Sequence, residues 1–321
     1  MSPAPRPDTA ADTAIAVLAR GLRLARGARD VVGELDLRIP QGQVVGLFGS
    51  NGAGKTTLLQ ALAGLLPVRE GELRVFGGSP AQARRSIGYV AQAVPDGAYS
   101  RLRARDFVAS AWQGERWGMS LSPSAGARRR AAVREALHAA DAGHLELRGL
   151  DTLSGGERQR VCIAQALVNP VRMLLLDEPL ANLDPRAQLG VLELVRGLRQ
   201  RHGLTVLLSA HDINPLLGVM DSVLYLAGGR GRQGRVDEVI EAGALSALYG
   251  LPMQVARHDG YLFIHPARGF MPEQGGHCAH GDAGAPDAPD AHAHDHGQDH
   301  GQDHAHDHDH APASHAAREP R

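Results

Sequence analysis

The clearest chemical signal in the chain is a glycine-rich segment that contains its single lysine. Residues 49–57 read GSNGAGKTT, which matches the spacing G-x-x-x-x-G-K-[ST] of phosphate-binding loops. Glycines allow backbone N–H groups to converge on phosphate oxygens, and a helix that begins there adds partial positive charge. The candidate nucleotide ligands are Gly49, Ser50, Asn51, Gly52, Ala53, Gly54, Lys55, Thr56 and Thr57.

Lys55 stands out because 33 of the 34 lysine and arginine residues are arginines. A lysine in such a chain marks a position where a compact ammonium is needed and a guanidinium will not serve. We expect Lys55 to reach the β- and γ-phosphates of a nucleotide and the Thr56 hydroxyl to ligate Mg²⁺. The alternative is an ordinary glycine turn capped by Thr56, which the strand, loop and helix pattern around it disfavours.

Two adjacent carboxylates, Asp177 and Glu178, follow the apolar run RMLLL. Ligand sites of open parallel sheets lie at the carboxyl ends of the strands, where this pair is expected. Asp177 would hold Mg²⁺ directly or through water, and Glu178 would polarise an attacking water as general base. The alternative is a pair of solvated acids in a turn, which the upstream phosphate-binding loop disfavours.

A second candidate anion site contains Ser154, Gly155 and Gly156 in the segment LSGGERQR. The serine is expected to start a helix, so hydroxyl and backbone donors would face outward from its positive end. The alternative is a capped surface helix, but glycines in its first turn would each cost about 1 kcal/mol of helix stability. The segment therefore predicts an anion site that lacks its own lysine.

A parallel α/β sheet is the fold that can position these groups. QVVGLFG, RMLLLDEP and GLTVLLSAHD are apolar runs of strand length, and helical patterns follow the first two. The first of these patterns, KTTLLQALAGLL, is expected to end at Pro67. Short alternating strands between Ala14 and Phe48 predict an antiparallel β flank, and residues from about 94 to 160 predict a helical subdomain.

Composition excludes several classes of protein. Hydrophobic residues make up 43% of the 321 and aromatic residues 4%, which favours a helix-rich α/β protein over an all-β one. Cys162 and Cys278 are isolated, so neither a disulfide framework nor a CxxC metal site is expected. No segment approaches roughly 18 uninterrupted apolar residues and no signal peptide is evident, so another polypeptide would have to span any membrane.

The C-terminal segment differs from the rest. From Met271 onward ten acidic residues accompany two arginines, which leaves about +7 on the preceding part. Proline, glycine, aspartate and histidine dominate residues 270–321, which cannot bury enough apolar surface to offset their ordering entropy. We expect this tail to be disordered without a ligand, and residues 1–13 to be disordered as well.

Eleven of the 17 histidines lie in this tail, many in His-x-His and Asp-His steps. Neutral imidazoles with nearby carboxylates suit Zn²⁺, Ni²⁺, Co²⁺ or Cu²⁺, and affinity order alone does not choose among them. The alternatives are a solubilising extension or an expression remnant, although a plain tag would not be interleaved with aspartate. The candidate metal ligands are His292, His294, His296, His300, His304, His306, His308 and His310.

These segments resemble the ATP-binding subunits of ABC transporters. The nucleotide loop is residues 49–57, LSGGERQ matches the signature, MLLLDEP the Mg²⁺ strand and ANLD, Ala181–Asp184, a dimer-contact loop. The resemblance covers about residues 14–269 and implies an ATP- and Mg²⁺-dependent ATPase with a P-loop core, an antiparallel β flank and a helical subdomain. It also implies that Gln92 in IGYVAQ senses Mg²⁺ and water, and that His211 in LLSAHD contacts the γ-phosphate.

The same resemblance implies that two copies sandwich ATP, with Ser154 and Gly156 of one copy completing the site of the other. Membrane permease subunits and an extracytoplasmic metal-binding protein are the expected partners, at the cytoplasmic face of the cell membrane. The LYG element, followed by a short sheet, and the segment RDFVASAWQGERWG are similar to the zinc, manganese and iron-chelate uptake branch. Generic packing of an amphipathic helix is the alternative for the latter segment.

The sequence departs from the family pattern at one position, and it leaves two other functions as alternatives. The family's adenine-stacking aromatic is missing from RLARGARD, where Arg26 either stacks through its guanidinium or is a solvated charge. One candidate is a soluble ABC ATPase acting on ribosomes, DNA or cofactor assembly scaffolds. Ribosome-acting members would carry two cassettes in one chain, and DNA-repair members a long coiled coil. This chain has neither, so no nucleic-acid partner is expected. A metal-buffering protein is the other candidate, and the intact nucleotide motifs argue against it.

Overall fold

The computed structural model describes residues 15–92, 101–112 and 123–267. The segments expected to be disordered, residues 1–13 and 270–321, lie outside these ranges, as do two stretches of the expected helical subdomain. The described residues fold as an α/β protein with a mixed sheet, an antiparallel sheet and a group of helices, which confirms the predicted fold class.

The main sheet of the described residues has six strands in the order β5-β6-β7-β3-β8-β9. Neighbours from β5 to β8 pair in parallel, and β9 pairs antiparallel with β8. The strands are β3 (Val44–Gly49), β5 (Ile87–Val90), β6 (Met173–Leu176), β7 (Thr205–Ser209), β8 (Ser222–Ala227) and β9 (Arg230–Gly234). The three apolar runs are parallel strands, as predicted, and the structure shows that they lie next to one another as β6, β7 and β3.

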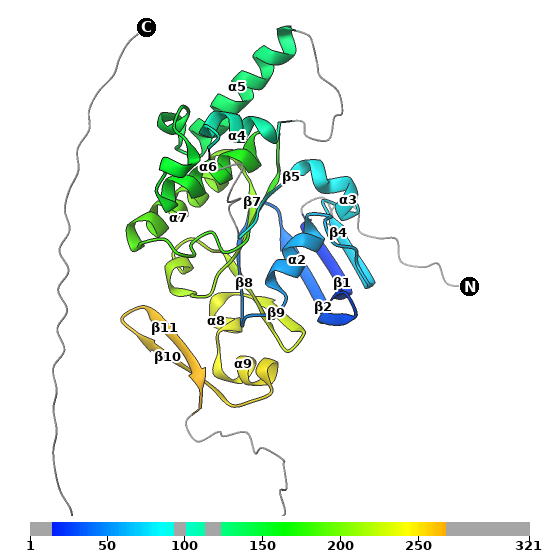
Figure 1. Ribbon diagram of the computed structural model, residues 1–321. Coiled ribbons are helices and arrows are strands. Elements are labelled where there is room, and N and C mark those ends of the chain that lie inside the picture. Colours follow the sequence, from blue (N-terminus) through cyan, green and yellow to red (C-terminus); the bar gives the residue numbers. More distant parts are fainter. Residues whose placement is uncertain (1–14, 93–100, 113–122, 268–321) are drawn as a thin grey trace, which may run out of the picture. The chain divides into compact units, whose positions relative to one another are not determined.

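A helical lobe gathers at one end of this sheet (Figure 1). It contains α4 (Ala104–Ser110), α5 (Pro123–Ala139), α6 (Gly155–Leu167) and the 3-10 turns η2 (Gly143–Leu145) and η3 (Leu150–Thr152). Helix α6 continues past residue 160 and leads directly toward β6. Helix α7 (Pro185–His202) then connects β6 to β7, as the helical pattern between them predicted.

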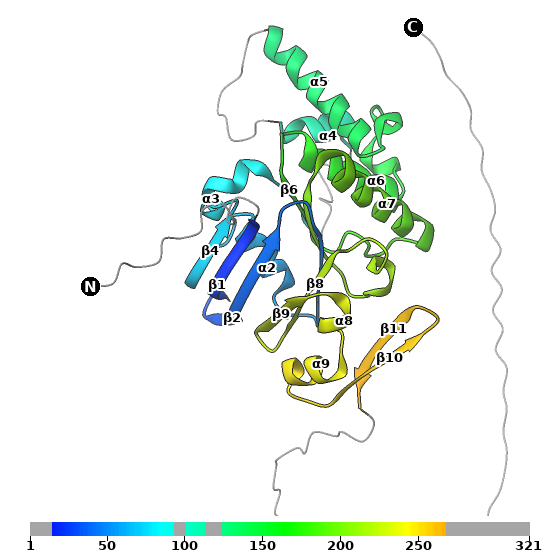
Figure 2. The ribbon, with the colours of Figure 1, turned by 180° about the vertical axis from the view of Figure 1, so that it is seen from behind.

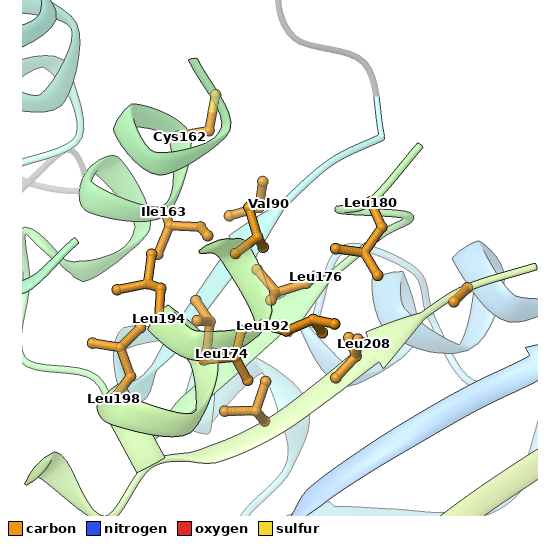
Figure 3. Close-up of a cluster of buried hydrophobic side chains, with 14 of the residues drawn as sticks. Val90, Cys162, Ile163, Leu174, Leu176, Leu180, Leu192, Leu194, Leu198 and Leu208 are labelled. Carbon is orange, nitrogen blue, oxygen red and sulfur yellow. The ribbon is translucent and has the colours of Figure 1, made fainter. Parts of the chain in front are cut away.

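Alternate residues of the central strands contribute to two hydrophobic clusters. In β6, Leu174 belongs to one cluster and Leu175 to the other. Because successive side chains of a strand point to opposite faces, the two clusters cover opposite faces of the sheet. Figure 3 shows the first cluster, in which Ile163 of α6 and Leu194 of α7 lie over the strand residues. The second cluster lies under α2 and a separate antiparallel sheet.

This three-stranded antiparallel sheet has the order β2-β1-β4. Strands β1 (Ile15–Arg26) and β2 (Arg29–Pro40) are each 12 residues long, and β4 (Glu70–Val75) is shorter. The alternation in the sequence predicted short strands here. Register shifts along the β1–β2 pairing interrupt that alternation while the pairing itself continues.

Helix α2 (Lys55–Leu62) ends four residues earlier than its apolar pattern predicted. Gly64 adopts a left-handed conformation with φ +69. The Leu65 N–H donates to the Gln60 carbonyl at 2.8 Å and the Gly64 N–H to the Ala61 carbonyl at 3.0 Å. This pair of hydrogen bonds is the Schellman arrangement that closes a helix at a glycine, so Gly64 ends the helix before Pro67 does.

The remaining elements follow the two sheets in sequence. Helix α3 (Pro80–Ala83) and the turn η1 (Arg84–Ser86) precede β5, and the turn η4 (Asn214–Leu216) follows β7. After β9 come α8 (Val236–Val239), α9 (Ala242–Tyr249) and a hairpin of β10 (Met253–His258) and β11 (Tyr261–Pro266), as seen from behind in Figure 2. The hairpin is the short sheet expected after LYG. Across the described ranges, every helix is too short or too polar to span a bilayer.

Candidate functional site

The glycine-rich loop connects β3 to α2, and two of its glycines are required by the backbone. Gly49 has φ +142, and a Cβ there would lie 2.2 Å from the carbonyl oxygen of Leu226. Gly54 has φ +104, and a Cβ there would lie 2.8 Å from Cγ2 of Val32. Gly52, at φ +80, borders open space. The loop is thus held close to its neighbours while leaving room on its outer side for a ligand.

Lys55 is the first residue of α2 and is 5% exposed. Its Nζ donates to the carbonyl oxygens of Gly49 at 2.8 Å and Ser50 at 3.3 Å. Burial lowers the pKa of Lys55, an effect opposed by the charges of Glu178 and Asp177. A buried ammonium that lies inside a glycine-rich loop is suited to binding a phosphate group. The phosphate charge would compensate the ammonium for the hydration it loses on burial.

The other predicted loop residues differ in how far they are exposed to solvent. Ser50 and Asn51 are exposed, and Ala53 is buried with its N–H donating to the Ser50 carbonyl at 3.1 Å. Thr56 is half-buried in the first turn of α2, whereas Thr57 is buried. Thr56 therefore has the accessible hydroxyl, and Thr57 contributes mainly to packing of the helix.

Asp177 directly follows β6 and is 2% exposed. Its Oδ1 accepts a hydrogen bond from the Ser209 hydroxyl at 2.8 Å, and its Oδ2 accepts one from the Tyr89 hydroxyl at 3.4 Å. Burial, and next the charge of Asp177, raise the pKa of Tyr89 to about 12. The tyrosine hydroxyl therefore keeps its proton at neutral pH and acts as a donor to this carboxylate.

Sequence reasoning missed Ser209 and Tyr89. Ser209 is fully buried at the end of β7, where it donates to Asp177 and accepts the Glu178 N–H at 2.8 Å. A lone serine after the apolar run TVLL was the available signal, because a buried hydroxyl must find a partner. Tyr89 lies in β5 beside β6, and its role becomes visible only once the strand order is known.

Glu178 is the point where the predicted catalytic residues meet. Gln92 Nε2 donates to Glu178 Oε2 at 2.6 Å, and His211 Nε2 lies 2.7 Å from Glu178 Oε1. The Glu178 side chain is 10% exposed, whereas the His211 side chain is 50% exposed. The structure thus brings Gln92, Glu178 and His211 together, from three separate segments of the chain.

The backbone of Glu178 is strained, with φ +51. A non-glycine residue held in this region costs about 1–3 kcal/mol, and such strain clusters at functional sites. The carboxylate borders a hollow of about 220 Å³ whose lining includes Asn182, Ser209, His211 and Pro215. The arrangement presents a largely buried carboxylate at the edge of a space large enough for solvent or a ligand.

The signature segment lies apart from these groups, in the helical lobe. Ser154 is the exposed N-cap of α6, and its Oγ accepts the Glu157 N–H while its own N–H donates to Glu157 Oε2 at 2.8 Å. The hydrogen bond from the Ser154 backbone lowers the pKa of Glu157. The expectation that backbone donors face outward here does not hold for the Ser154 N–H, which a capping box already uses.

Close packing also accounts for the two glycines after Ser154. A Cβ on Gly155 would lie 3.0 Å from Leu183 Cδ2, and one on Gly156 would lie 2.9 Å from Ala187 Cβ. The start of α6 therefore packs directly against the segment that begins α7. Within that segment, the predicted dimer-contact residue Asp184 caps α7 by accepting the N–H groups of Arg186 and Ala187 at 3.0 Å.

Two further predicted sites have different outcomes. Arg26, the residue nearest the expected adenine position, is exposed at the tip of the β1–β2 hairpin, and its Nη2 donates to Gln60 Oε1 of α2 at 2.9 Å. The eight tail histidines from His292 to His310 lie outside the described residues. In the described ranges, no three histidine, cysteine, aspartate or glutamate residues are grouped closely enough to hold a metal ion.

Comparisons with known proteins identify the family of the chain. Residues 32–181 match the family model described as ABC transporter. The chain is 37% identical over 214 residues to the zinc transport system ATP-binding protein TroB of Treponema pallidum, covering 67% of this chain and 79% of that protein. It is 38% identical over 255 residues to the hemin import ATP-binding protein HmuV of Bordetella pertussis, covering 75% of this chain and 94% of that protein.

Among solved structures, the chain is similar to a transporter described as of metal-chelate ABC type in an inward-facing conformation. That similarity has a TM-score of 0.64 and 27% identity, and it covers 78% of this chain and 96% of the solved one. Sequence, fold and the convergence on Glu178 lead to one assignment. The chain belongs to the ABC transporter family, as an ATP-binding, ATP-hydrolysing subunit of an importer.

Proposed function

We propose that this subunit powers the import of a transition metal, with zinc as the first candidate, or of a metal chelate. The observation that carries this choice of cargo is the tail, which holds eleven of the chain's 17 histidines, many of them in His-x-His and Asp-His steps. The names of two relatives, one for zinc transport and one for hemin import, support the same class of cargo. Manganese remains within the class, because the sequence resemblance extends to that branch.

In the proposed nucleotide site, Lys55 and the N–H groups of the loop hold the phosphates of ATP. Thr56, Gln92 and Asp177 are the residues that would hold Mg²⁺, which supplies charge neutralisation on the phosphates. Ser209 and Tyr89 fix both oxygens of the Asp177 carboxylate, so that carboxylate is preorganised.

We assign Glu178 as the general base that takes a proton from the attacking water. Its carboxylate lines the hollow that could hold such a water, which is the placement that a general base requires. Gln92 and His211 hold its two oxygens and would orient the water and the γ-phosphate respectively. Glu178, Gln92 and His211 therefore all follow strands of the central sheet and lie at the same edge of it.

The signature residues act, in this proposal, on the nucleotide of a second copy. Ser154 and Gly155 are exposed at the amino end of α6, and Gly156 is half-buried beside them. An exposed helix N-terminus attracts anions through its free N–H groups and its dipole. A homodimer with two ATP molecules between the copies would bring each signature to the other copy's phosphates.

The proposed partners are membrane permease subunits, contacted through the helical lobe, and an extracytoplasmic metal-binding protein in the same system. The subunit would then work at the cytoplasmic face of the cell membrane. Closing of the dimer on ATP, and its opening after hydrolysis, can drive the permease only if the two states differ in their affinity for it. The tail would buffer the metal or tune the importer without being needed for hydrolysis.

Uptake by cells tests the choice of cargo. Cells that lack the chain are complemented with the wild-type chain or with Glu178→Gln, and accumulation of zinc, manganese, hemin and an aliphatic sulfonate is measured. We expect the wild-type chain, and not the variant, to restore uptake of one of the first three. Restored uptake of the sulfonate alone would contradict a metal cargo while leaving the assignment as an importer intact.

A further inference from the structure

Asn214 joins the segment after β7 to the C-terminal hairpin. Its Nδ2 donates to the Leu262 carbonyl at 3.0 Å, and its Oδ1 accepts the Leu262 N–H at 2.7 Å. One side-chain amide thereby pairs with both backbone groups of a residue in β11, as a neighbouring strand would. Figures 1 and 2 both place the hairpin next to the loop that follows β7.

The amide of Asn214 is itself held in place. Asp212 Oδ1 accepts the Asn214 N–H at 3.0 Å and a second hydrogen bond from Nδ2 at 2.9 Å. Leu262 is 5% exposed and belongs to the same hydrophobic cluster as Ile213. Both hydrogens of the Asn214 amide are used, and apolar packing shields the pairing from water, which favours a single geometry.

His211 lies between this pairing and the central sheet. On one side, the Ala210 N–H donates to the Leu47 carbonyl of β3 at 3.1 Å. On the other side, the chain is fixed three residues later by Asn214. The His211 ring is half exposed and contacts Glu178, so its position depends on how the backbone is held at both ends.

We propose that the β10–β11 hairpin is a positioning element for His211 and that Asn214 transmits its effect. This inference rests on the proposed catalytic role of His211. The hairpin ends at Pro266, and the histidine-rich tail continues from it along the chain. The Asn214–Leu262 pairing is therefore a physical connection between the C-terminal part of the chain and the catalytic carboxylate.

A general contribution to stability is the competing explanation, and the chain offers a matched control for it. Gln233 of β9 makes the same kind of pairing with Arg38 of β2, with distances of 2.7 Å from Nε2 to the carbonyl and 2.9 Å from the N–H to Oε1. Gln233→Ala removes a comparable two-bond pairing with a backbone at another place in the fold, although that pairing is more exposed and has no counterpart of the Asp212 bond. A purely structural role predicts that each variant loses stability in proportion to its bonds, with no selective fall in kcat and no selective gain in exchange between residues 210 and 217.

The experiment compares full-length Asn214→Ala, Gln233→Ala and His211→Ala with the wild-type chain. We expect Asn214→Ala to lower kcat for ATP by about 10- to 100-fold, as a displacement of about 1 Å at a reacting group does, with KM changed less than about twofold. Hydrogen exchange of the amides between residues 210 and 217 should also become faster. Gln233→Ala should keep the wild-type kcat and the wild-type exchange in that segment.

The outcomes separate the inference from the role it rests on. If His211→Ala is slow and Asn214→Ala hydrolyses ATP at the wild-type rate, the hairpin does not position His211. If His211→Ala itself keeps the wild-type rate, the proposed role of His211 is wrong. Asn214→Ser is a second variant, which keeps a polar side chain at this position. Thermal unfolding identifies any variant that fails to fold. An Asn214→Ser chain that is folded, with wild-type kcat and exchange, would also overturn the inference.

Discussion

The Nε2 atom of His211 lies 2.7 Å from Oε1 of Glu178, although the two residues follow different strands. Glu178 follows β6 and His211 follows β7, and these strands are parallel neighbours. On the other side of β6, the parallel strand β5 leads to Gln92, which contacts the second carboxylate oxygen. Strand β6 thus supplies the carboxylate, and its neighbours β5 and β7 each supply one group that contacts it, because the carboxyl ends of parallel strands share one edge.

Lys55→Ala should weaken ATP binding by about 10- to 100-fold, because a hydrogen bond from a charged group contributes about 1.5–3 kcal/mol. Lys55→Arg should fall short of full rescue, since the buried space beside the Gly49 carbonyl fits a compact ammonium. Titration with a fluorescent nucleotide measures both. Arg69→Ala, which removes an exposed pair with Asp30, is the control for loss of a cation. Wild-type affinity in Lys55→Ala would refute the phosphate role.

Ser154→Arg should prevent ATP-dependent dimerisation, because a long cationic side chain would occupy the exposed amino end of α6. Size-exclusion chromatography with ATP and Mg²⁺, in a Glu178→Gln background that hydrolyses slowly, reports the dimer. Ser79→Arg is the matched control, because Ser79 caps α3 through the same capping box with Gln82. The background chain should dimerise and the control should as well. A strictly monomeric background chain at saturating ATP would count against the sandwich.

Tyr89→Phe should raise the Mg²⁺ concentration needed for half-maximal hydrolysis severalfold, since Asp177 Oδ2 loses a donor. The pKa of Tyr89 is raised to about 12, so its hydroxyl stays protonated and the effect should be equal at pH 7 and pH 9. Tyr225→Phe removes a buried hydroxyl that pairs with Tyr249 and should leave the Mg²⁺ requirement unchanged. An unchanged requirement in Tyr89→Phe would mean that Ser209 alone fixes the carboxylate.

The sequence predicted much of the fold because the strands at the nucleotide site are buried on both faces. Apolar runs of strand length ending in a glycine loop or in Asp177-Glu178 leave few alternatives to a parallel sheet. The end of α2 could not be placed in the same way. Its apolar pattern continues to Leu66, and the stop comes from the left-handed Gly64, whose hydrogen bonds depend on the folded backbone.

For the site, motif residues were easier to find than the residues that support them. Gln92, Glu178 and His211 lie in recognisable segments, and the structure places them in contact. Tyr89 and Asn214 are ordinary residues in sequence, because their importance depends on strand order and on a contact with a distant hairpin.

The tail should bind Zn²⁺ or a related ion, and the affinity should fall as pH drops through about 6.5, where imidazoles become protonated and cannot ligate. Calorimetry at pH 7.5 and 5.5 compares the full chain with a variant in which the eight candidate histidines are asparagine. His258→Asn with His265→Asn, on the hairpin before the tail, is the control and should leave binding intact. Equal Zn²⁺ binding by the eight-histidine variant and the wild-type chain would exclude these eight histidines as the ligands.

Phosphate release by Glu178→Gln tests the central claim most directly, because this substitution removes the base and leaves the phosphate-binding loop intact. The rate should fall by about 10²- to 10⁴-fold, the usual contribution of a positioned general base, while nucleotide affinity changes less than about twofold. Glu193→Gln, an exposed carboxylate on α7, should keep the wild-type rate. Comparable phosphate release by Glu178→Gln and the wild-type chain would contradict the account of this site.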